Sequence, residues 1–348
     1  MKKITAVTLT VFMLITMLAG CSGSKEAASD AVSGDGTLQS QIDTSDEYIA
    51  VCCLNNLEYF NAHKYGWEKA GELFGVKTSW VGPTDDDVSA MVSAMDSAVA
   101  KNPAGIAVWG YDPALEASIN SALEKGINIV TFCGDVSTSD RLSYIGSSQY
   151  DMGYDGGRLY AESVGGEGKI AIMTLPGNTM FEERQAGFEA AFAEYPGIEI
   201  VAYGDTKADT VTAVSAATDI INSHSEITGF VFTDSTGAAG ASTAVQEANK
   251  AGQIDVLGMD RNSDILNQIK DGLITASIVQ NDVSMGYWSM VSLITAKYGG
   301  NNIALTSDDA AAGVKTAPNN IYTSVNLVTA ETADYYLEAN EWYAGNSF

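Results

Sequence analysis

The sequence predicts an α/β protein with two similar lobes, each built around a doubly wound parallel sheet and joined by three crossovers. Short apolar segments without alternation recur roughly every 25–30 residues, which is typical of strands buried on both faces and separated by crossover helices. Segments with the three-and-four apolar spacing of helices lie between them. The cycle restarts after residue 147, and 348 residues are enough for two cores.

The first 20 residues are expected to be a bacterial lipoprotein signal peptide. Two lysines precede an apolar run over residues 4–18, which is short for a transmembrane span. The run leads into a Leu-Ala-Gly-Cys sequence that looks like a lipobox, so Cys21 is the expected lipidation site. A diacyl-type anchor supplies the two chains that stable membrane attachment requires. Residues 21–47 are rich in Ser, Gly, Ala and Asp and are expected to form a flexible tether.

The first lobe is expected to contain five consecutive strands with helices between them. Thr84 followed by Asp87 resembles a capping box, and Asp112 before Pro113 places a cap ahead of a proline at the first helical position. A later helix over residues 282–298 returns to this lobe. The expected strands begin near Tyr48, Val76, Ala104 and Ile127, and the fifth spans Leu142–Ser147.

The second lobe repeats this alternation of strands and amphipathic helices. Residues 208–224 carry a single apolar stripe, which indicates a helix with one buried face. The tail from Ile321 adds a strand and an aromatic-rich segment. The expected strands are Lys169–Thr174, Ile198–Tyr203, Phe230–Thr233, Asp255–Met259 and Leu273–Val279.

The chain therefore divides into two discontinuous lobes. The first comprises residues 48–147 plus 281–320, and the second comprises residues 148–280 plus 321–348. The three crossovers between them are expected near Ser147, Gln280 and Pro318–Ile321.

The charge excludes several classes of partner. The formal charge is −26, from 18 basic and 44 acidic residues. Removal of Lys2 and Lys3 with the signal leaves 16 against 44, a charge of −28. Such a surface repels nucleic acid and anionic lipid, because both bind through basic patches. The acidity is interpreted as a solubility trait.

The sequence offers no metal site, catalytic centre or cofactor motif. His63 and His224 are the only histidines and lie on separate expected helices, so both are expected to be packing or surface residues. No glycine-rich phosphate cradle follows the first strand. Cys52, Cys53 and Cys133 are expected to stay unpaired. In a sheet ordered 2-1-3-4-5 the first and fourth strands lie about 9–10 Å apart, whereas a disulfide needs Cα atoms about 5–6 Å apart.

Polar and aromatic residues follow the expected strands at their carboxyl ends, where open α/β sheets bind ligands. Asn56, Tyr59 and Phe60 follow the first strand, and Asp260 follows the strand that ends at Met259. Trp109 ends the third strand, where it either stacks on a ligand or packs within its lobe. A ligand is therefore expected in a cleft between the two lobes.

Six segments carry a family resemblance through their order and spacing. They are Cys53–Asn56, Ile127–Phe132, Tyr144–Ser147, Arg184–Phe188, Val256–Asp260 and Asp271–Gln280. Together they resemble the periplasmic sugar-binding proteins of the ribose-binding type, whose fold is shared by the effector domains of LacI-type repressors. The resemblance implies a type I periplasmic binding protein fold, with the sugar held by carboxylates, amides, an arginine and aromatic rings. Such groups suit hydroxyl pairs and apolar carbon faces.

The resemblance also implies roles for individual residues. Asn56 resembles the amide of the first cleft loop, and Phe60 or Tyr59 resembles its aromatic partner. Arg184 matches the arginine that reaches the sugar from the second lobe. Asp260 matches the sugar-binding aspartate at the end of its strand.

Three further positions complete the implied site. Gln280 matches a glutamine at a lobe crossover, where it binds sugar and marks a hinge. The family often has Asp-Arg after the fourth strand, where this chain has Cys133-Gly-Asp135, so Asp135 either takes over the carboxylate role or caps a turn. Asp234 stands where an amide is usual, a change that keeps acceptors but removes donors.

The sequence thus predicts a lipid-anchored, extracytoplasmic solute-binding protein that is not an enzyme. It is expected to bind a monosaccharide as a monomer, close its lobes and deliver the sugar to the permease subunits of an ABC importer. An alternative is a sensor subunit that hands a sugar or furanosyl signal to a chemoreceptor or kinase. A third interpretation, an extracellular enzyme, would use Asp135 and Asp260 as paired carboxylates.

Overall fold

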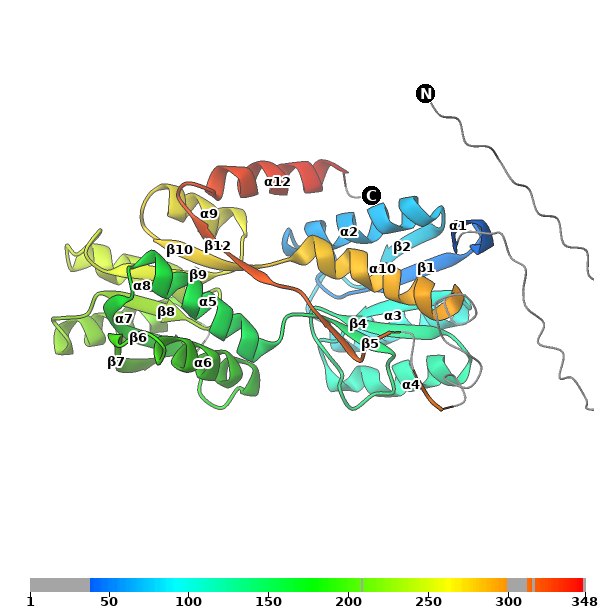
Figure 1. Cartoon of the computed structure of the whole chain (residues 1–348), viewed down its shortest axis with the longest axis horizontal. Coiled ribbons are helices and arrows are strands. Elements are labelled where there is room, and N and C mark those ends of the chain that lie inside the picture. The colour runs from blue at the N-terminus through cyan, green and yellow to red at the C-terminus, as the bar shows by residue number, and fades with distance from the viewer. Residues whose placement is uncertain (1–37, 208, 299–311, 315–316, 347–348) are drawn as a thin grey trace, which may run out of the picture. The chain divides into compact units, whose positions relative to one another are not determined.

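Two six-stranded sheets form the frameworks of the two lobes (Figure 1). The expected signal peptide, Cys21 and the tether before residue 38 lie outside the residues that the structure describes. Among the residues described, none of the helices combines the length and apolar character that a membrane span requires. The computed structural model describes residues 38–207, 209–298, 312–314 and 317–346.

The first sheet has the strand order β11-β5-β4-β3-β1-β2, and its strand pairings are parallel. This is the expected 2-1-3-4-5 order, extended by one strand from near the C-terminus. Helices α2 and α10 cover one face, and α3 and α4 cover the other. The elements are α1 (Leu38–Gln41), β1 (Glu47–Val51), α2 (Tyr59–Phe74), β2 (Lys77–Val81), α3 (Val88–Ala100), β3 (Gly105–Trp109), η1 (Pro113–Leu115), α4 (Glu116–Glu124), β4 (Asn128–Phe132), β5 (Ser143–Gly146), α10 (Asp282–Tyr298) and β11 (Asn320–Tyr322).

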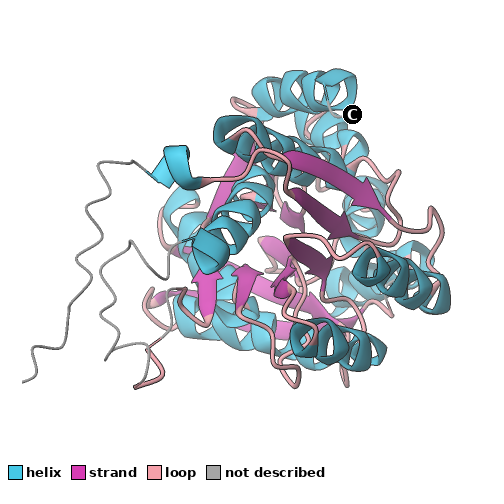
Figure 2. Ribbon diagram, turned by 90° about the vertical axis from the view of Figure 1, so that its right-hand side faces the viewer, coloured by secondary structure: helices cyan, strands magenta, loops and turns pink. Residues whose placement is uncertain are grey.

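The second sheet repeats this order as β12-β10-β9-β8-β6-β7, with β12 antiparallel to β10. Helices α5 and α6 cover one face, and α7, α8 and α9 cover the other, so strands lie between layers of helices (Figure 2). The predicted fold class is confirmed. The elements are α5 (Gln149–Ser163), β6 (Glu167–Thr174), α6 (Thr179–Phe192), β7 (Gly197–Asp205), α7 (Thr210–Ser223), β8 (Gly229–Phe232), α8 (Gly237–Glu247), β9 (Asp255–Met259), α9 (Ser263–Lys270), β10 (Ala276–Gln280), β12 (Val325–Thr329) and α12 (Ala333–Asn346).

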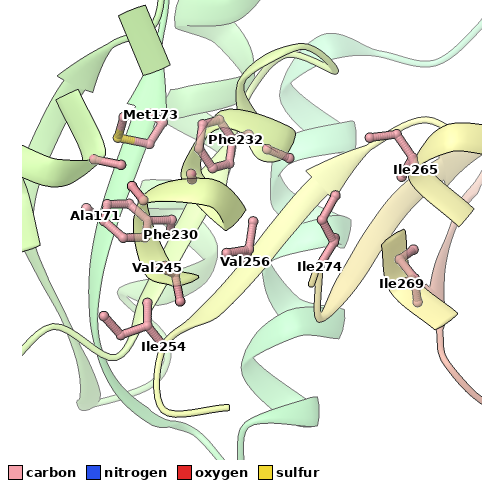
Figure 3. Packing of buried hydrophobic residues seen from close by; sticks show 14 of the residues in the cluster. Ala171, Met173, Phe230, Phe232, Val245, Ile254, Val256, Ile265, Ile269 and Ile274 are labelled. Carbon is pink, nitrogen blue, oxygen red and sulfur yellow. The ribbon is translucent and has the colours of Figure 1, made fainter. Parts of the chain in front are cut away.

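The central strands are mostly apolar because both of their faces are buried. Along β1, Tyr48 and Ala50 pack on the α2 and α10 side, whereas Ile49 and Val51 pack on the α3 and α4 side. The same holds in the second lobe, where Figure 3 shows one of its two core layers. Continuous burial of this kind removes the two-residue alternation of a half-exposed strand.

Two helix starts illustrate how local capping sets the element boundaries. The Asp112 carboxylate accepts from Ala114 N at 2.8 Å, with Pro113 next to it as predicted. For α3 the N-cap is Asp87, which accepts from Ala90 N at 2.9 Å, so the capping box predicted to begin at Thr84 is wrong. The helix starts three residues later because Asp87 itself supplies the capping oxygen.

The last residues of the expected tether belong to the first lobe. Ile42 is buried in its core. The Asp43 backbone N–H donates to the Tyr298 hydroxyl at 3.0 Å, and the same hydroxyl donates to Asp46. These contacts attach residues 42–46 to the end of α10, so the described chain is packed well before residue 47.

The chain passes between the sheets at three places, after β5, after β10 and between β11 and β12. The third passage lies between Tyr322 and Val325, because β11 pairs with β5 whereas β12 pairs with β10. Ile321 and Tyr322 therefore lie in the first sheet, although the expected division assigns them to the second lobe.

Candidate ligand-binding cleft

A cavity of about 970 Å³ lies where the carboxyl ends of strands from both sheets meet. Its walls come from the segments that follow β3, β4, β8 and β9 and from the end of β10. A concave site at this edge of a parallel sheet is the usual place for a small ligand. Of the predicted site residues, those that line it are Tyr59, Trp109, Asp135, Arg184, Asp234, Asp260 and Gln280.

The cleft contains a matched pair of strained backbone positions. Cys133 follows β4 with φ 61°, and Asp260 follows β9 with φ 70°. Each residue comes after the fourth strand of its sheet, and each donates its N–H to the neighbouring fifth strand, Cys133 to Ile145 O at 2.9 Å and Asp260 to Ile278 O at 2.8 Å. Positive φ is uncommon for residues other than glycine and concentrates at functional sites. The two lobes therefore present equivalent residues to the cavity.

Arg184 projects into the cavity from α6. Its Nε donates to Gln149 Oε1 and its Nη1 donates to the Thr233 carbonyl, both at 2.7 Å. The guanidinium also lies 5.3 Å from the centre of the Phe181 ring. Burial lowers the pKa of Arg184, and the charge of Asp260 opposes that change. A guanidinium has five donors, so donors remain for a ligand.

Asp260 supplies a carboxylate from the end of β9. Burial raises the pKa of its carboxyl, whereas the charge of Arg184 and a hydrogen bond from Ser235 lower it. A carboxylate beside an arginine is well suited to a pair of neighbouring hydroxyls, because one group accepts and the other donates.

Asp135 is held in a bidentate pair with Arg141. Arg141 Nε donates to Oδ1 at 2.6 Å and Nη2 donates to Oδ2 at 2.5 Å, while Thr131 Oγ1 also donates to Oδ1 at 2.7 Å. Arg141 lines the cavity and is absent from the predicted site. Arg141 lies eight residues beyond Cys133, just before β5. A rare arginine next to a strand start was the available clue.

Tyr59 connects the lobes through its hydroxyl. Gln280 Nε2 donates to Tyr59 Oη at 3.1 Å, and the same oxygen lies 3.2 Å from Cys133 Sγ. Burial raises the pKa of the Cys133 thiol to about 12, so the thiol is neutral. Phe60 is buried, with 1% of its surface exposed, and its ring centre lies 5.0 Å from that of Trp109. Tyr59, and not Phe60, therefore reaches the main cavity.

Trp109 and Tyr111 form an aromatic wall after β3. Their ring centres lie 4.5 Å apart with 31° between the ring planes, and both residues line the cavity. Tyr111 donates its hydroxyl to Asp86 at 2.7 Å, which fixes this ring at the rim. Trp109 packs on Phe60 and also borders the cavity, so its stacking on a ligand stays a prediction.

Asn56 and Asp234 are predicted site residues that the structure does not make available to a ligand in the same way as the others. Asn56 is exposed and does not line the cavity, because the loop before α2 turns it outward while Asn55 donates to Gly82 O. Asp234 lines the cavity, but Oδ1 accepts from Thr236 and from Gly237 N, and Oδ2 accepts from Thr206. This carboxylate is occupied at the start of α8 and has little capacity left for a ligand.

Several lining residues lie outside the predicted set. Tyr144, Gln149 and Phe181 join Arg141 on the cavity wall. They lie on β5, α5 and α6, and none follows a strand in the manner that marks Asp260. In the described part of the chain, no group of three His, Cys, Asp or Glu side chains is arranged to hold a metal ion.

The chain is similar to a known protein family and to several individual proteins. The family described as "Periplasmic binding protein domain" matches residues 49–301. The D-allose-binding periplasmic protein of Escherichia coli is 24% identical over 270 residues, which cover 74% of this chain and 87% of that protein. The ribose import binding protein of Bacillus subtilis is 24% identical over 240 residues, covering 68% of this chain and 77% of that protein.

Two solved structures share the fold. AraP, an arabinose binding protein from Geobacillus stearothermophilus, has a TM-score of 0.78 at 29% identity and covers 84% of this chain and 99% of its own. The sugar-binding protein of a sugar ABC transporter from Bacillus halodurans has a TM-score of 0.75 at 29% identity, covering 84% of this chain and 100% of its own.

Proposed function

Because this chain belongs to the periplasmic binding protein family, we propose that it captures a monosaccharide between its two lobes and releases it chemically unchanged. The observation that carries this proposal is the cavity at the carboxyl ends of both sheets. Arg184 and Asp260 line it together with the rings of Tyr59 and Trp109. Charged planar groups bind hydroxyl pairs, and aromatic rings cover the apolar face of a sugar.

The relatives support a role in uptake. Those described above are binding proteins for sugars or components of sugar transport. We propose that the chain is a monomer anchored through Cys21 to the outer face of the cytoplasmic membrane and that it delivers its sugar to the permease of an ABC importer. Closure of the lobes around the three crossovers would present the loaded form to that permease.

The enzyme and sensor interpretations gain no support from the site or from the relatives. The family consists of binding proteins, and Asp135 is occupied by Arg141 on both of its oxygens, so it does not form a free catalytic pair with Asp260. The relatives named above are not described as sensors. We therefore propose solute binding for uptake, without catalysis or signalling.

A thermal-shift screen of the purified chain against pentoses, hexoses and polyols tests the proposal. A sugar at 100 times its dissociation constant should stabilise the protein by about 2.7 kcal/mol. Arg184→Ala and Asp260→Ala should abolish the shift while the ligand-free variants stay folded. Arg158→Ala is the matched control, because Arg158 is an exposed arginine on α5 paired with Glu162. A normal shift in the two cleft variants would show that the sugar binds elsewhere, and conversion of the sugar would support an enzyme.

A further inference from the structure

The residue that follows the cleft aspartate is anchored outside the main cavity. Asp260 lines that cavity, whereas the next residue, Arg261, lines a separate small void together with Asn340 of α12. Arg261 is buried, with 9% of its surface exposed. A buried guanidinium needs hydrogen-bond acceptors, because it loses its contacts with water on folding. Helix α12 supplies these acceptors.

Asn340 holds Arg261 by its side chain and by its backbone. Arg261 Nε and Nη2 donate to Asn340 Oδ1 at 3.1 and 2.8 Å. In return, Asn340 Nδ2 donates to the Arg261 carbonyl at 2.9 Å. Both ends of one buried amide are therefore used on a single residue, and each would be costly to leave unpaired.

Two rings of α12 complete the support for Arg261. The centre of its guanidinium lies 4.8 Å from the ring centre of Tyr336 and 5.5 Å from that of Tyr343. A cation at such distances is attracted to an aromatic face. The ring centre of Tyr343 also lies 5.2 Å from that of Tyr65 on α2, and α12 packs on both α9 and α2 (Figure 1). The helix that holds Arg261 is therefore supported by both lobes.

Asp260 depends on such support because its backbone is strained. Its φ is 70°, and a residue other than glycine stays in this region only where the surrounding structure holds it. Strand β10 provides two bonds, since Asp260 N–H donates to the Ile278 carbonyl at 2.8 Å and Ser277 Oγ donates to the Asp260 carbonyl at 2.6 Å. The contact between Arg261 and Asn340 fixes the residue that comes next.

The equivalent position in the first lobe lacks this anchor. Cys133 has φ 61° and makes the matching bond to Ile145, but the next residue is Gly134, which has no side chain. Gly134 is instead paired through its backbone, because its carbonyl accepts from Gly110 N at 3.1 Å. Anchoring by a side chain of α12 is thus specific to the lobe that carries Asp260.

The segment that provides the anchor lies outside the part of the chain that matches the family. Helix α12 spans Ala333–Asn346, whereas the match covers residues 49–301. We propose, on the basis of the proposed function, that Asn340 is a positioning residue for Asp260. Acting through Arg261, it keeps the Asp260 carboxylate aimed into the cavity and so raises the affinity for the sugar. A group that is held in its binding geometry loses less freedom when the ligand arrives.

Amide hydrogen exchange measures the positioning of Asp260 without any ligand. In Asn340→Ala the Asp260 N–H should exchange about tenfold faster than in the wild-type chain, because local opening becomes easier. The Cys133 N–H makes the matching bond in the first lobe and should exchange at the wild-type rate. Asn346→Ala is the matched control, because this amide donates within α12 to the Trp342 carbonyl, and it should change neither rate.

Calorimetry with D-allose, D-ribose, D-xylose and L-arabinose measures the effect on binding. For the sugar that binds the wild-type chain most tightly, Asn340→Ala should raise Kd about tenfold, the size of effect expected when one hydrogen bond to a charged group is lost. Stopped-flow measurements should place most of this change in faster release, as is usual for variants of one site. Asn346→Ala should bind normally.

A substitution on the other side of the contact shows whether the two residues act together. Arg261→Met keeps a flexible apolar side chain against Tyr336 and Tyr343 but cannot donate to Asn340, and it should raise Kd by a similar factor. The double variant should have a Kd within about threefold of either single variant. Ligand-free unfolding transitions check that each variant folds, and Arg261→Met alone carries the test if Asn340→Ala does not.

The outcomes separate this inference from the proposed function. If the Asp260 N–H exchanges at the wild-type rate in the folded variants, or if Kd is unchanged, Asn340 does not position the carboxylate and the inference is refuted while sugar binding stands. A Kd about a hundredfold above wild type in the double variant would mean independent effects and would refute the route through Arg261. If none of the four sugars binds the wild-type chain, the proposed function and the affinity claim both fail.

Discussion

Neutral groups, and not a carboxylate, are the hydrogen-bond partners that hold Arg184 in the cleft. Gln149 and the Thr233 carbonyl each accept one of its N–H groups at 2.7 Å. Neutral acceptors orient a guanidinium without neutralising its charge, so the cation remains available to a ligand oxygen. Gln149 lies on α5 just after the first crossover, which makes it a positioning residue for Arg184.

Substitution of Gln149 tests this positioning role. Gln149→Ala should raise the Kd for the sugar by about tenfold, because one hydrogen bond to a charged group is lost and Arg184 gains other rotamers. Titration calorimetry measures the change. Gln185→Ala, which removes an amide on α6 paired with Glu189, is the control and should bind normally. An unchanged Kd for Gln149→Ala would show that Arg184 is held by packing alone.

His63 and Asp282 form a buried pair close to the second crossover. His63 Nε2 lies 3.9 Å from Asp282 Oδ1, and neither atom has a hydrogen-bond partner among the described residues. His63 Nδ1 lies 3.3 Å from the Tyr59 carbonyl, which makes Nδ1 the protonated nitrogen. Burial lowers the pKa of His63 to about 3 and raises the pKa of Asp282 well above its ordinary value. We therefore expect Asp282 to be protonated beside a neutral His63.

This protonation state predicts a pH dependence of stability. A carboxyl whose pKa is raised on folding stabilises the protein fully below its unfolded pKa of about 3.9, and that stabilisation is lost as pH rises toward the folded pKa. Asp282→Asn does not titrate, so its free energy of unfolding should rise relative to wild type by up to about 1.4 kcal/mol per pH unit above pH 4. The His63 contribution is common to both proteins and cancels.

Urea unfolding of both proteins between pH 4 and pH 8 measures the difference. Asp219→Asn, an exposed aspartate on α7, is the control and should follow the wild-type curve. If Asp282→Asn instead loses stability relative to wild type as pH rises, Asp282 is ionised in the folded protein and forms an ion pair with His63.

At the scale of elements, close helix packing positions the cleft residues. Helix α5 approaches α6 at Gly153, where an added Cβ would lie 2.0 Å from the backbone oxygen of Arg184. Helix α10 approaches α2 in the same manner at Gly286, where a Cβ would lie 2.0 Å from His63 O. These contacts bring helix backbones together without side chains between them. The path of α6, and with it the direction of Arg184, therefore depends on a glycine in another helix.

Gly153→Ala should disturb binding through this contact. The methyl group would push α6 away from α5, so we expect a stability loss of about 1–3 kcal/mol and a weaker sugar affinity. Thermal unfolding and calorimetry measure the two effects. Gly345→Ala is the control, because nothing lies within 4 Å of a Cβ there. Unchanged affinity in Gly153→Ala would mean that α6 adjusts without moving Arg184.

At the scale of the whole folded domain, contacts between lobes extend beyond the crossovers. Ser263 Oγ donates to Glu58 Oε1 at 2.5 Å, and Ser263 N donates to Glu58 Oε2 at 3.3 Å. Helix α12 also spans the two lobes, because it packs on α9 of the second lobe while Trp342 contacts Tyr65 of α2 with ring centres 4.5 Å apart. Such contacts stabilise one relative arrangement of the lobes over others.

Loss of the Ser263 hydroxyl should make the closed complex shorter-lived. Ser263→Ala should speed sugar release about three- to tenfold, because a hydrogen bond from one lobe to a charged group on the other is removed. Stopped-flow fluorescence of the sugar complex measures the rate. Ser223→Ala, which alters an exposed serine on α7, should leave it unchanged. An unaltered release rate in Ser263→Ala would show that this contact does not act on the bound state.

Local patterns determined much of the fold. Helix α10 spans the predicted residues 282–298, and β9 matches the predicted strand at both ends. Both were predictable because a continuous apolar segment indicates a buried strand and apolar residues three and four apart indicate a helix, and both patterns involve residues close together in the sequence. The position of Asp260 in the cleft was also predictable, since the carboxyl end of a parallel strand is a ligand site whatever the rest of the chain does.

The sequence by itself thus determined the order of elements, the doubly wound sheets and the strand ends that carry the cleft. Only the tertiary structure decided which side chains are available there. Arg141 donates to the Asp135 carboxylate, and the backbone N–H at the start of α8 donates to the Asp234 carboxylate. The loop before α2 leaves Asn56 exposed to solvent. Secondary structure depends on neighbours along the chain, whereas the direction and free hydrogen-bonding capacity of a side chain depend on groups that meet it only after folding.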